Sequence, residues 1–228
     1  MHLKLVFTLI GFILLSINVS AQVMPFPAFD EASQDSDFLN FRTEFIQAIE
    51  ANDTKFIFKN SIDDVMNGFG GSGGLAELAD FWEQISPNLL SVLKQGGYFS
   101  PQDWLEADVE AQYTAPYTDR YPQEPNDWPT TIDWIFSTGA ITNNAAEVVD
   151  VPGGRIMETL GQVIVVVSDW WPDTNPDNID NPLWVEIELA DGRKGNISAS
   201  QINSPVGYRC FFEKRAGKWF FAGWAAGD

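Results

Sequence analysis

The clearest candidate for ligand chemistry in this 228-residue chain is a loop in which oxygen-bearing side chains alternate. Asp173, Asn175, Asp177 and Asp180 follow the spacing by which a turning backbone can surround a calcium ion. The sixth place of the loop lacks glycine, and Trp184 stands at the twelfth, where an EF-hand has glutamate, so an EF-hand is excluded. A looser calcium site and a solvated turn, which Asp and Asn favour without any metal, both stay open.

Tryptophan side chains flank the same loop. Trp170 and Trp171 come directly before it, and Trp184 follows its last proline by two residues. The flat faces of such rings, with acids nearby, can hold the face of a sugar ring or a cationic, proline-rich peptide. The loop over residues 169–182, together with Trp184, is therefore a candidate recognition surface for a glycan or a peptide.

Histidine and cysteine are nearly missing from the sequence. The one histidine is His2 and the one cysteine is Cys210. Because His2 falls within a predicted export signal, the mature chain would hold no imidazole, which excludes Ser-His-Asp and Cys-His catalysis in their usual forms and the common zinc sites. Cys210 lies beside two phenylalanines and is expected to act as a small buried apolar residue. We therefore expect no enzyme, and no cofactor other than calcium at the loop.

Carboxylates supply the remaining route to catalysis. Glycan hydrolysis uses two of them on either side of the scissile bond. With 32 acidic residues, neighbouring acids arise by chance, and nothing in the sequence places two of them across a cleft. A carboxylate-dependent glycan hydrolase is the alternative to a binding function, and the acids that could serve it are Asp63 and Asp64; Glu106, Asp108 and Glu110; and Glu124 and Asp127.

The chain is strongly acidic, with 32 Asp and Glu against 13 Lys and Arg and a formal net charge of -19. Such a surface repels phosphate backbones and anionic headgroups, so neither nucleic acid nor an anionic membrane surface is an expected partner. An acidic surface keeps exported proteins soluble. It would also suit an inhibitor of a basic envelope enzyme, a third function class, whose association would depend strongly on salt.

The first 21 residues have the pattern of an export signal. Lys4 precedes an apolar run over residues 5–15, and Ala21 ends a stretch of small or short side chains that a signal peptidase reads. The apolar run is shorter than the roughly 18 residues that a bilayer span needs, and no cysteine stands at the cleavage site to accept a lipid. We predict cleavage after Ala21 and a periplasmic or secreted protein that does not insert into a membrane after cleavage.

The hydrophobic pattern predicts a mainly helical domain over residues 36–131, after a flexible leader over 22–35. Apolar residues at helical spacing predict one helix over 37–51 and a shorter one that starts near Lys55 and reaches Met66. The glycine-rich segment 68–74 lacks the Gly-Lys-Ser/Thr ending of a nucleotide loop and is interpreted as a turn. The helical period resumes over 75–93, where Pro87 is expected to break or restart the helix. Residues 98–136, rich in proline, are expected to wrap this domain.

Short stretches with strand pattern fill residues 132–228. In residues 184–189 apolar side chains alternate with glutamates, and Asp191-Gly192 supplies the positive φ angles of a two-residue hairpin turn. Residues 208–213 and 218–224 lie on either side of an Ala216-Gly217 turn and are expected to pair as a closing hairpin. Short strands separated by turn residues are what a small barrel needs.

The order of elements over residues 184–202 is a tryptophan, a strand, Asp-Gly-Arg, a second strand and Ser-x-x-Ile. It resembles the bacterial Src-homology-3-like (SH3b) domain of cell-envelope proteins, and the resemblance covers about residues 139–203. Such barrels usually carry Gly-Trp at the last sheet turn, where this chain has Gly195-Asn196, so the resemblance implies that Asn196 borders the ligand groove. The predicted fold class is therefore α+β, with a helical N-terminal domain followed by an SH3-like β-barrel over 132–228 and an extra C-terminal hairpin.

The mature chain as a whole also resembles an uncharacterised family of exported bacterial proteins in which a helical unit precedes that barrel. The resemblance implies no enzymatic activity. We therefore expect an exported, non-enzymatic binding or scaffold protein of the bacterial cell envelope, whose barrel recognises an envelope peptide, glycan or protein. The matching segments are Phe38-x-x-Phe41-x-x-x-Phe45, Gly96-Gly-Tyr-Phe99, Ala115-Pro-Tyr117, residues 204–209, Phe212-Glu-Lys-x-x-Gly-Lys-Trp219 and Ala226-Gly-Asp228.

Overall fold

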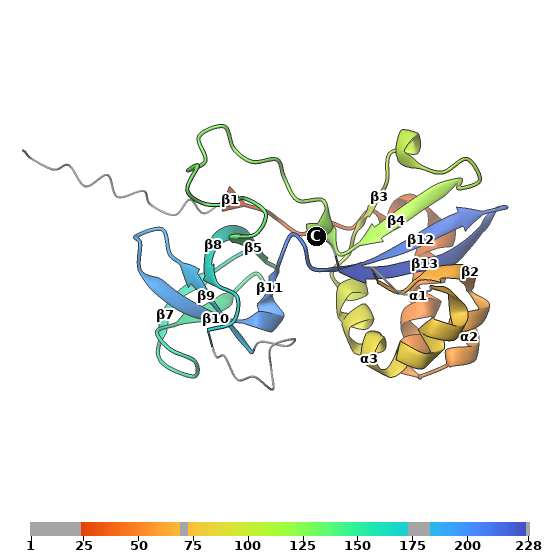
Figure 1. The fold of residues 1–228 in the computed structure, drawn as a ribbon, viewed down its shortest axis with the longest axis horizontal. Coiled ribbons are helices and arrows are strands. Elements are labelled where there is room, and N and C mark those ends of the chain that lie inside the picture. Colours follow the sequence, from red (N-terminus) through yellow and green to blue (C-terminus); the bar gives the residue numbers. More distant parts are fainter. Residues whose placement is uncertain (1–23, 69–72, 173–182, 227–228) are drawn as a thin grey trace, which may run out of the picture.

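The computed structural model describes residues 24–68, 73–172 and 183–226, and in this part of the chain two β-sheets stand side by side (Figure 1). The first, called here the helix-covered sheet, carries the long helices on one face. Its strands, in spatial order, are β2 (Ser61–Met66), β13 (Lys218–Ala226), β12 (Tyr208–Arg215), β4 (Ala111–Ala115) and β3 (Tyr98–Phe99).

The second, called the eight-stranded sheet, is formed mainly by the middle of the chain. Its strands, in spatial order, are β11 (Ile202–Asn203), β5 (Thr138–Ile141), β8 (Val163–Asp169), β9 (Trp184–Glu188), β10 (Lys194–Ser198), β6 (Ala146–Val149) and β7 (Ile156–Leu160), and β1 (Met24–Pro25) pairs with β8 outside this path.

Three helices and several short 3-10 turns complete the described structure. Helix α1 begins where the Asp35 side chain accepts hydrogen bonds from the backbone N–H groups of Asp37 and Phe38, and Asp53 caps α2 in the same way through Phe56. The helices are α1 (Ser36–Glu50), α2 (Thr54–Lys59) and α3 (Gly74–Lys94), and the 3-10 turns are η1 (Ala32–Gln34), η2 (Gln102–Trp104), η3 (Tyr117–Asp119) and η5 (Ala199–Gln201).

The described chain crosses between the two sheets three times. It leaves the eight-stranded sheet after β1 and enters the helix-covered sheet through η1 and α1. It returns between β4 and β5, and crosses again between β11 and β12 (Figure 1). Both sheets are therefore assembled from segments far apart in the sequence.

The core of the helix-covered sheet forms between its strands and the helices. Phe45 of α1 is fully buried, with its ring centroid 5.3 Å from that of Phe212 on β12 and 5.4 Å from that of Phe221 on β13. Phe38 packs in the same way on Trp219, at 4.7 Å. Burying one such side chain stabilises the fold by about 1.5–3 kcal/mol. The apolar stripe of α1 thus finds its partners in the last two strands of the chain.

The predicted fold class, a helical N-terminal domain followed by a small SH3-like barrel, is therefore wrong. The described part of the chain is mostly β, and its helices pack on a sheet instead of forming a domain of their own. The hairpin β12–β13 does form as predicted, but it lies at the centre of the helix-covered sheet and does not extend a barrel. The cause is long-range pairing, since β12 pairs with β4 about a hundred residues earlier in the chain.

Two predictions for the helices are wrong. Helix α2 ends at Lys59, because the Asn60 and Ser61 side chains donate to the carbonyls of Phe56 and Ile57 and so satisfy its last turn. Residues 61–66, predicted to continue this helix, form β2, which pairs with β13. Helix α3 runs through Pro87 without the predicted break. Pro87 lies on the solvent-exposed side of the helix, where water can take the place of the missing backbone donor.

The predicted helix over 37–51 and the hairpin around Asp191-Gly192 are confirmed as α1 and as the β9–β10 pair. On β9, Val185 and Ile187 point into the core and alternate with half-buried Glu186 and Glu188. The connecting loop is one residue longer than predicted, because Leu189 N–H donates to the carbonyl of Arg193. Residues 134–136, within the region predicted to be filled with short strands, lie in a turn before β5.

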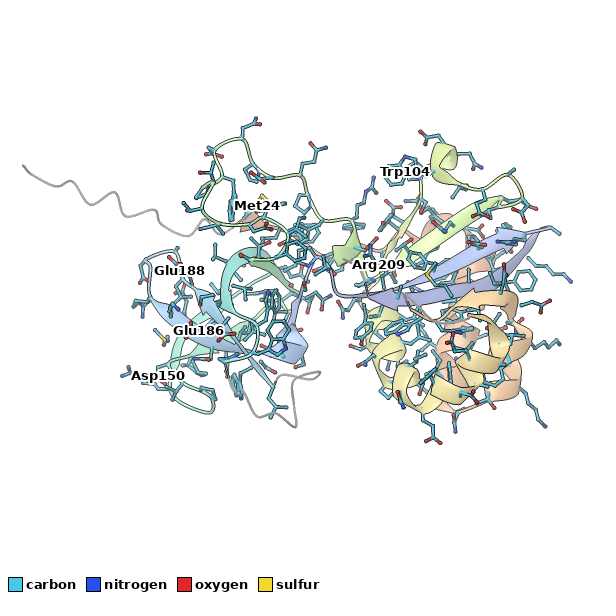
Figure 2. The ribbon with its side chains drawn as sticks, in the orientation of Figure 1. Met24, Trp104, Asp150, Glu186, Glu188 and Arg209 are labelled. Atoms are coloured by element: carbon cyan, nitrogen blue, oxygen red, sulfur yellow. The ribbon has the colours of Figure 1, made fainter. Side chains whose placement is uncertain are left out.

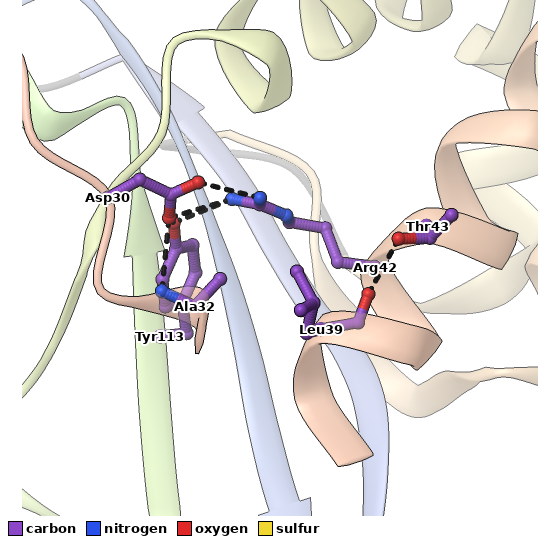
Figure 3. A network of polar contacts seen from close by, with 6 residues as sticks. All are labelled: Asp30, Ala32, Leu39, Arg42, Thr43 and Tyr113. Carbon is purple, nitrogen blue, oxygen red and sulfur yellow. Dashed lines mark hydrogen bonds and ion pairs between the residues drawn. The ribbon is translucent and has the colours of Figure 1, made fainter. Parts of the chain in front are cut away.

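Residues 24–35, for which the sequence favours a flexible leader, are bound to both sheets. Beyond β1, Phe26 packs on Tyr117 at 5.3 Å between ring centroids. Asp30 then accepts two hydrogen bonds from Arg42 (3.0 and 2.7 Å) and one from the hydroxyl of Tyr113 (2.7 Å), as Figure 3 shows. Burial by itself would raise the pKa of Asp30, but the hydrogen bonds from Arg42 and Tyr113 outweigh it and lower that pKa below the usual 3.8.

Candidate functional site

A cleft of about 400 Å³ lies between the two sheets. One wall comes from α3 and η3, and the other from η5, β11 and the segment that leads into β12. Its volume is near the lower end of the about 300–1,000 Å³ that small-molecule sites occupy. Clefts between structural units are common ligand sites, so this one is the candidate functional site of the described chain.

Helix α3 presents polar side chains to the cleft. Asn88, Ser91 and Gln95 all line it. Their spacing of three and four residues places them on one face of a helix, while Leu89 and Leu93 between them are buried against the helix-covered sheet. Helix α3 therefore contributes an apolar face to the core and an uncharged polar face to the cleft.

A half-buried amide in the cleft lining joins the two sheets. Nδ2 of Asn203, on β11, donates to Oε1 of Gln95 (2.6 Å) and to Oγ1 of Thr118 (2.9 Å). Asn203 belongs to the eight-stranded sheet, while Gln95 follows α3 and Thr118 lies in η3. In the described part of the chain, Oδ1 of Asn203 and the amide N–H groups of Gln95 make no hydrogen bond of their own.

The charge at the cleft is neutralised. Asp119 lines the cleft, and its carboxylate accepts from Arg209 at 2.7 Å and from the hydroxyl of Tyr98 at 2.6 Å. Burial and the neighbouring carboxylate raise the pKa of Tyr98, so this phenol stays protonated and keeps donating. Figure 2 shows Arg209 at the junction of the two sheets, whereas Asp150, Glu186 and Glu188 lie out on the eight-stranded sheet.

Two aromatic rings line the cleft, one from each sheet. Trp170 follows β8 and is held by a hydrogen bond from its Nε1 to the carbonyl of Phe136 (3.0 Å). Tyr208 begins β12 and stacks on Trp224, with ring centroids 4.8 Å apart and ring planes 10° apart. Trp224 is buried, while Tyr208 is 49% exposed. The Tyr208 ring is thus held in place by buried Trp224 on one face and is partly accessible to a ligand.

Of the binding residues predicted from sequence, Trp170 alone lines the cleft. Trp171 is 49% exposed and is not among the lining residues. Trp184 shares a face of β9 with Glu186, opposite to Val185, which does line the cleft. Asn196 is buried and donates to the carbonyl of Asp150 (3.3 Å), so it holds a turn beside β6 instead of bordering this cleft.

The predicted calcium ligands Asp173, Asn175, Asp177 and Asp180 lie outside the described residues. Within residues 24–68, 73–172 and 183–226, no three His, Cys, Asp or Glu side chains gather as a metal ion would require. A calcium site in the loop stays a prediction from the sequence.

The acid groups considered for glycan hydrolysis lie away from the cleft lining. Asp108 pairs with Arg215 (2.9 Å), and Glu110 accepts from the backbone N–H of Gly217 (3.0 Å), both at the tip of the β12–β13 hairpin. None of the seven acids named for this role is among the residues that line the cleft. Asp119 is the single carboxylate of the described lining, and both of its oxygens are occupied.

The sequence reasoning missed Asn88, Gln95, Asn203 and Tyr208. Asn88 lies on the polar face of a helix that the pattern did predict, and Gln95 directly follows that helix, so the polar face was a detectable signal. Asn203 and Tyr208 carry no local signal, because they become site residues only when β11 and β12 join different sheets.

No family model, curated protein or solved structure matches this chain. Among the helices of the described residues, none combines the length and the apolar character needed to cross a bilayer. The kind of ligand that the cleft can bind is therefore inferred from the side chains that line it.

Proposed function

We propose that this protein is an exported, non-enzymatic binding protein of the bacterial cell envelope and that the cleft between its two sheets is the ligand site. The observation that carries the proposal is the composition of the lining. Aromatic platforms from both sheets stand beside amides and hydroxyls from α3 and β11, and the one charged side chain of the described lining, Asp119, is already paired. Apolar walls with a few convergent polar groups are typical of a small-molecule binding site.

The alternative of a carboxylate-dependent hydrolase has less support. Its mechanism needs a second carboxylate about 5–10 Å from the first, and one of the two has to donate or accept a proton. The described lining offers only Asp119, and both of its carboxylate oxygens already accept hydrogen bonds, from Arg209 and from Tyr98. A binding function needs neither a second acid nor a mobile proton.

Export is supported by the pattern of residues 1–21 and by the net charge of -19. Fractionation of the native bacterium, followed by mass spectrometry of the purified protein, tests it. We expect the protein in the periplasm or the medium with Gln22 as its first residue. A cytoplasmic protein that still begins at Met1 would refute export.

Ligand-observed NMR tests the binding function. The purified protein is mixed with the low-molecular-mass fraction of the native envelope, and saturation transfer identifies molecules that bind. We expect bound signals that disappear with Tyr208→Leu and persist with Trp104→Ala, because Trp104 is 73% exposed in η2 and does not line the cleft. Identical spectra for the wild type and Tyr208→Leu would contradict a ligand site in the cleft.

A further inference from the structure

From the same side chains we infer the class of the ligand: the cleft binds an uncharged oligosaccharide. This inference rests on the proposed binding function. Its first support is electrostatic. The chain has a net charge of -19, yet the described lining holds one charged side chain, Asp119, and Arg209 compensates it at 2.7 Å. A cationic ligand finds no free carboxylate there, and an anionic ligand finds no free cation and meets the repulsion of the whole protein.

The second support is the kind of hydrogen-bonding group that the cleft offers. Asn88, Ser91 and Gln95 on one wall and Ser200 and Asn203 on the other are amides and hydroxyls, each able to donate and to accept. Sugar hydroxyls have the same dual character. Among the described residues, the N–H groups of Gln95 and Oδ1 of Asn203 have no other partner, so they provide a donor and an acceptor whose side chains are joined by one 2.6 Å hydrogen bond. Such a pair matches a hydroxyl group better than it matches an ion.

The third support is the pair of aromatic rings. The C–H face of a pyranose ring is apolar and flat, and it covers an aromatic face well. Tyr208 has one face on Trp224, and its 49% exposure shows that much of the remaining ring is accessible. Trp170 contributes from the eight-stranded sheet. The neutral cleft thus combines apolar rings, which can cover the C–H face of a sugar, with side chains that can donate to and accept from its hydroxyl groups.

An uncharged peptide is the nearest competitor, and the backbone geometry disfavours it. Proteins commonly bind an extended peptide by adding it as a strand to an exposed sheet edge. The sheet edge that lines the cleft is β11, which consists of Ile202 and Asn203 and so offers very few backbone groups for such pairing. Side chains, and not a strand edge, supply the hydrogen bonds of this site.

A mixed array of uncharged oligosaccharides, acidic oligosaccharides and uncharged peptides tests the inference. The wild type is compared with two cleft variants, Tyr208→Leu and Asn88→Leu, and with the control Trp104→Ala. Both cleft positions are exposed, so these variants are expected to fold. Circular dichroism and the unfolding midpoint verify this for each protein. Positive probes are then titrated by calorimetry.

We expect at least one uncharged oligosaccharide to bind, with affinity reduced about tenfold or more by Tyr208→Leu and about three- to tenfold by Asn88→Leu. Trp104→Ala should bind like the wild type. Binding of uncharged peptides alone, lost with Tyr208→Leu, would overturn the sugar inference and leave the binding function standing. Tighter binding of acidic sugars, or sugar binding equal in all variants, would also overturn it. If no probe binds in a way that depends on the cleft residues, both proposals fall.

Discussion

Replacing Arg42 by methionine should destabilise this protein through the tether that holds the N-terminal segment. The Arg42 side chain is 12% exposed and donates two hydrogen bonds to Asp30, at 3.0 and 2.7 Å, and one to the hydroxyl of Tyr113, at 2.9 Å. Methionine keeps much of the apolar stem and removes the guanidinium. The experiment therefore isolates the polar contacts of Figure 3.

The expected loss in free energy of unfolding follows from these contacts. Hydrogen bonds to a charged group contribute about 1.5–3 kcal/mol each, so the two to Asp30 set an upper limit of about 6 kcal/mol. Asp30 is 39% exposed, and water replaces part of what Arg42 provides. After that discount we expect about 2–3 kcal/mol, or a fall in Tm of about 5–10 °C for a chain of this size.

Lys94→Met is the matched control. Lys94 and Glu50 are joined by an ion pair of the same 2.7 Å length, but their side chains are 53% and 46% exposed. An exposed pair contributes about 0–1 kcal/mol, so this variant should stay within about 0.5 kcal/mol of the wild type. Urea unfolding followed by tryptophan fluorescence measures both variants. Equal losses for Arg42→Met and Lys94→Met would refute the reasoning that burial makes the Arg42 tether strong.

Three further predictions concern other features of the described chain. Because the folded state lowers the pKa of Asp30 below 3.8, the stability that its carboxylate contributes is present above pH 3.8 and is lost as the pH falls through the pKa of the folded state. The difference in urea midpoint between the wild type and Asp30→Asn should therefore shrink from about pH 6 to about pH 3, and a constant difference would contradict this linkage. Burial raises the pKa of the Cys210 thiol, so a chromogenic thiol reagent at about pH 8 should leave the native protein unmodified and label it in urea; rapid labelling of the native protein would show that Cys210 is accessible. Ala216 has φ 48° in the β12–β13 turn, so Ala216→Gly should stabilise by about 0.5–1 kcal/mol in thermal unfolding, and a loss of stability would show that the turn does not strain the alanine.

Elements with a strong local signal were predictable from the sequence. Helix α1 has apolar residues at helical spacing, and its predicted range differs from the observed one by a single residue at each end. The β9–β10 and β12–β13 hairpins have alternating patterns around Gly192 and Gly217, where the backbone takes positive φ. These features depend on interactions between residues close together in the chain.

Elements whose partners are distant were mispredicted. Residues 61–66 have apolar side chains that fit either a helix or a strand, and their pairing with β13 decides for a strand. Residues 111–115 form β4 because β12 lies beside them, with Cys210 opposite Ala115. The contact between Phe45 and Phe221 joins residues from the two ends of the described chain. Periodicity carries no information about such pairings.

The sequence by itself determined the acidic charge, the single cysteine, the pattern of an export signal and the apolar face of each main helix. Only the tertiary structure decided that the last hairpin joins the helices, because strand pairing between β12 and β4 depends on bringing distant backbone groups together. The passage of the chain between the two sheets also forms the cleft. Gln95, Asn203 and Tyr208 meet there because the chain crosses between its sheets, and a one-dimensional pattern cannot record which residues such a crossing brings together.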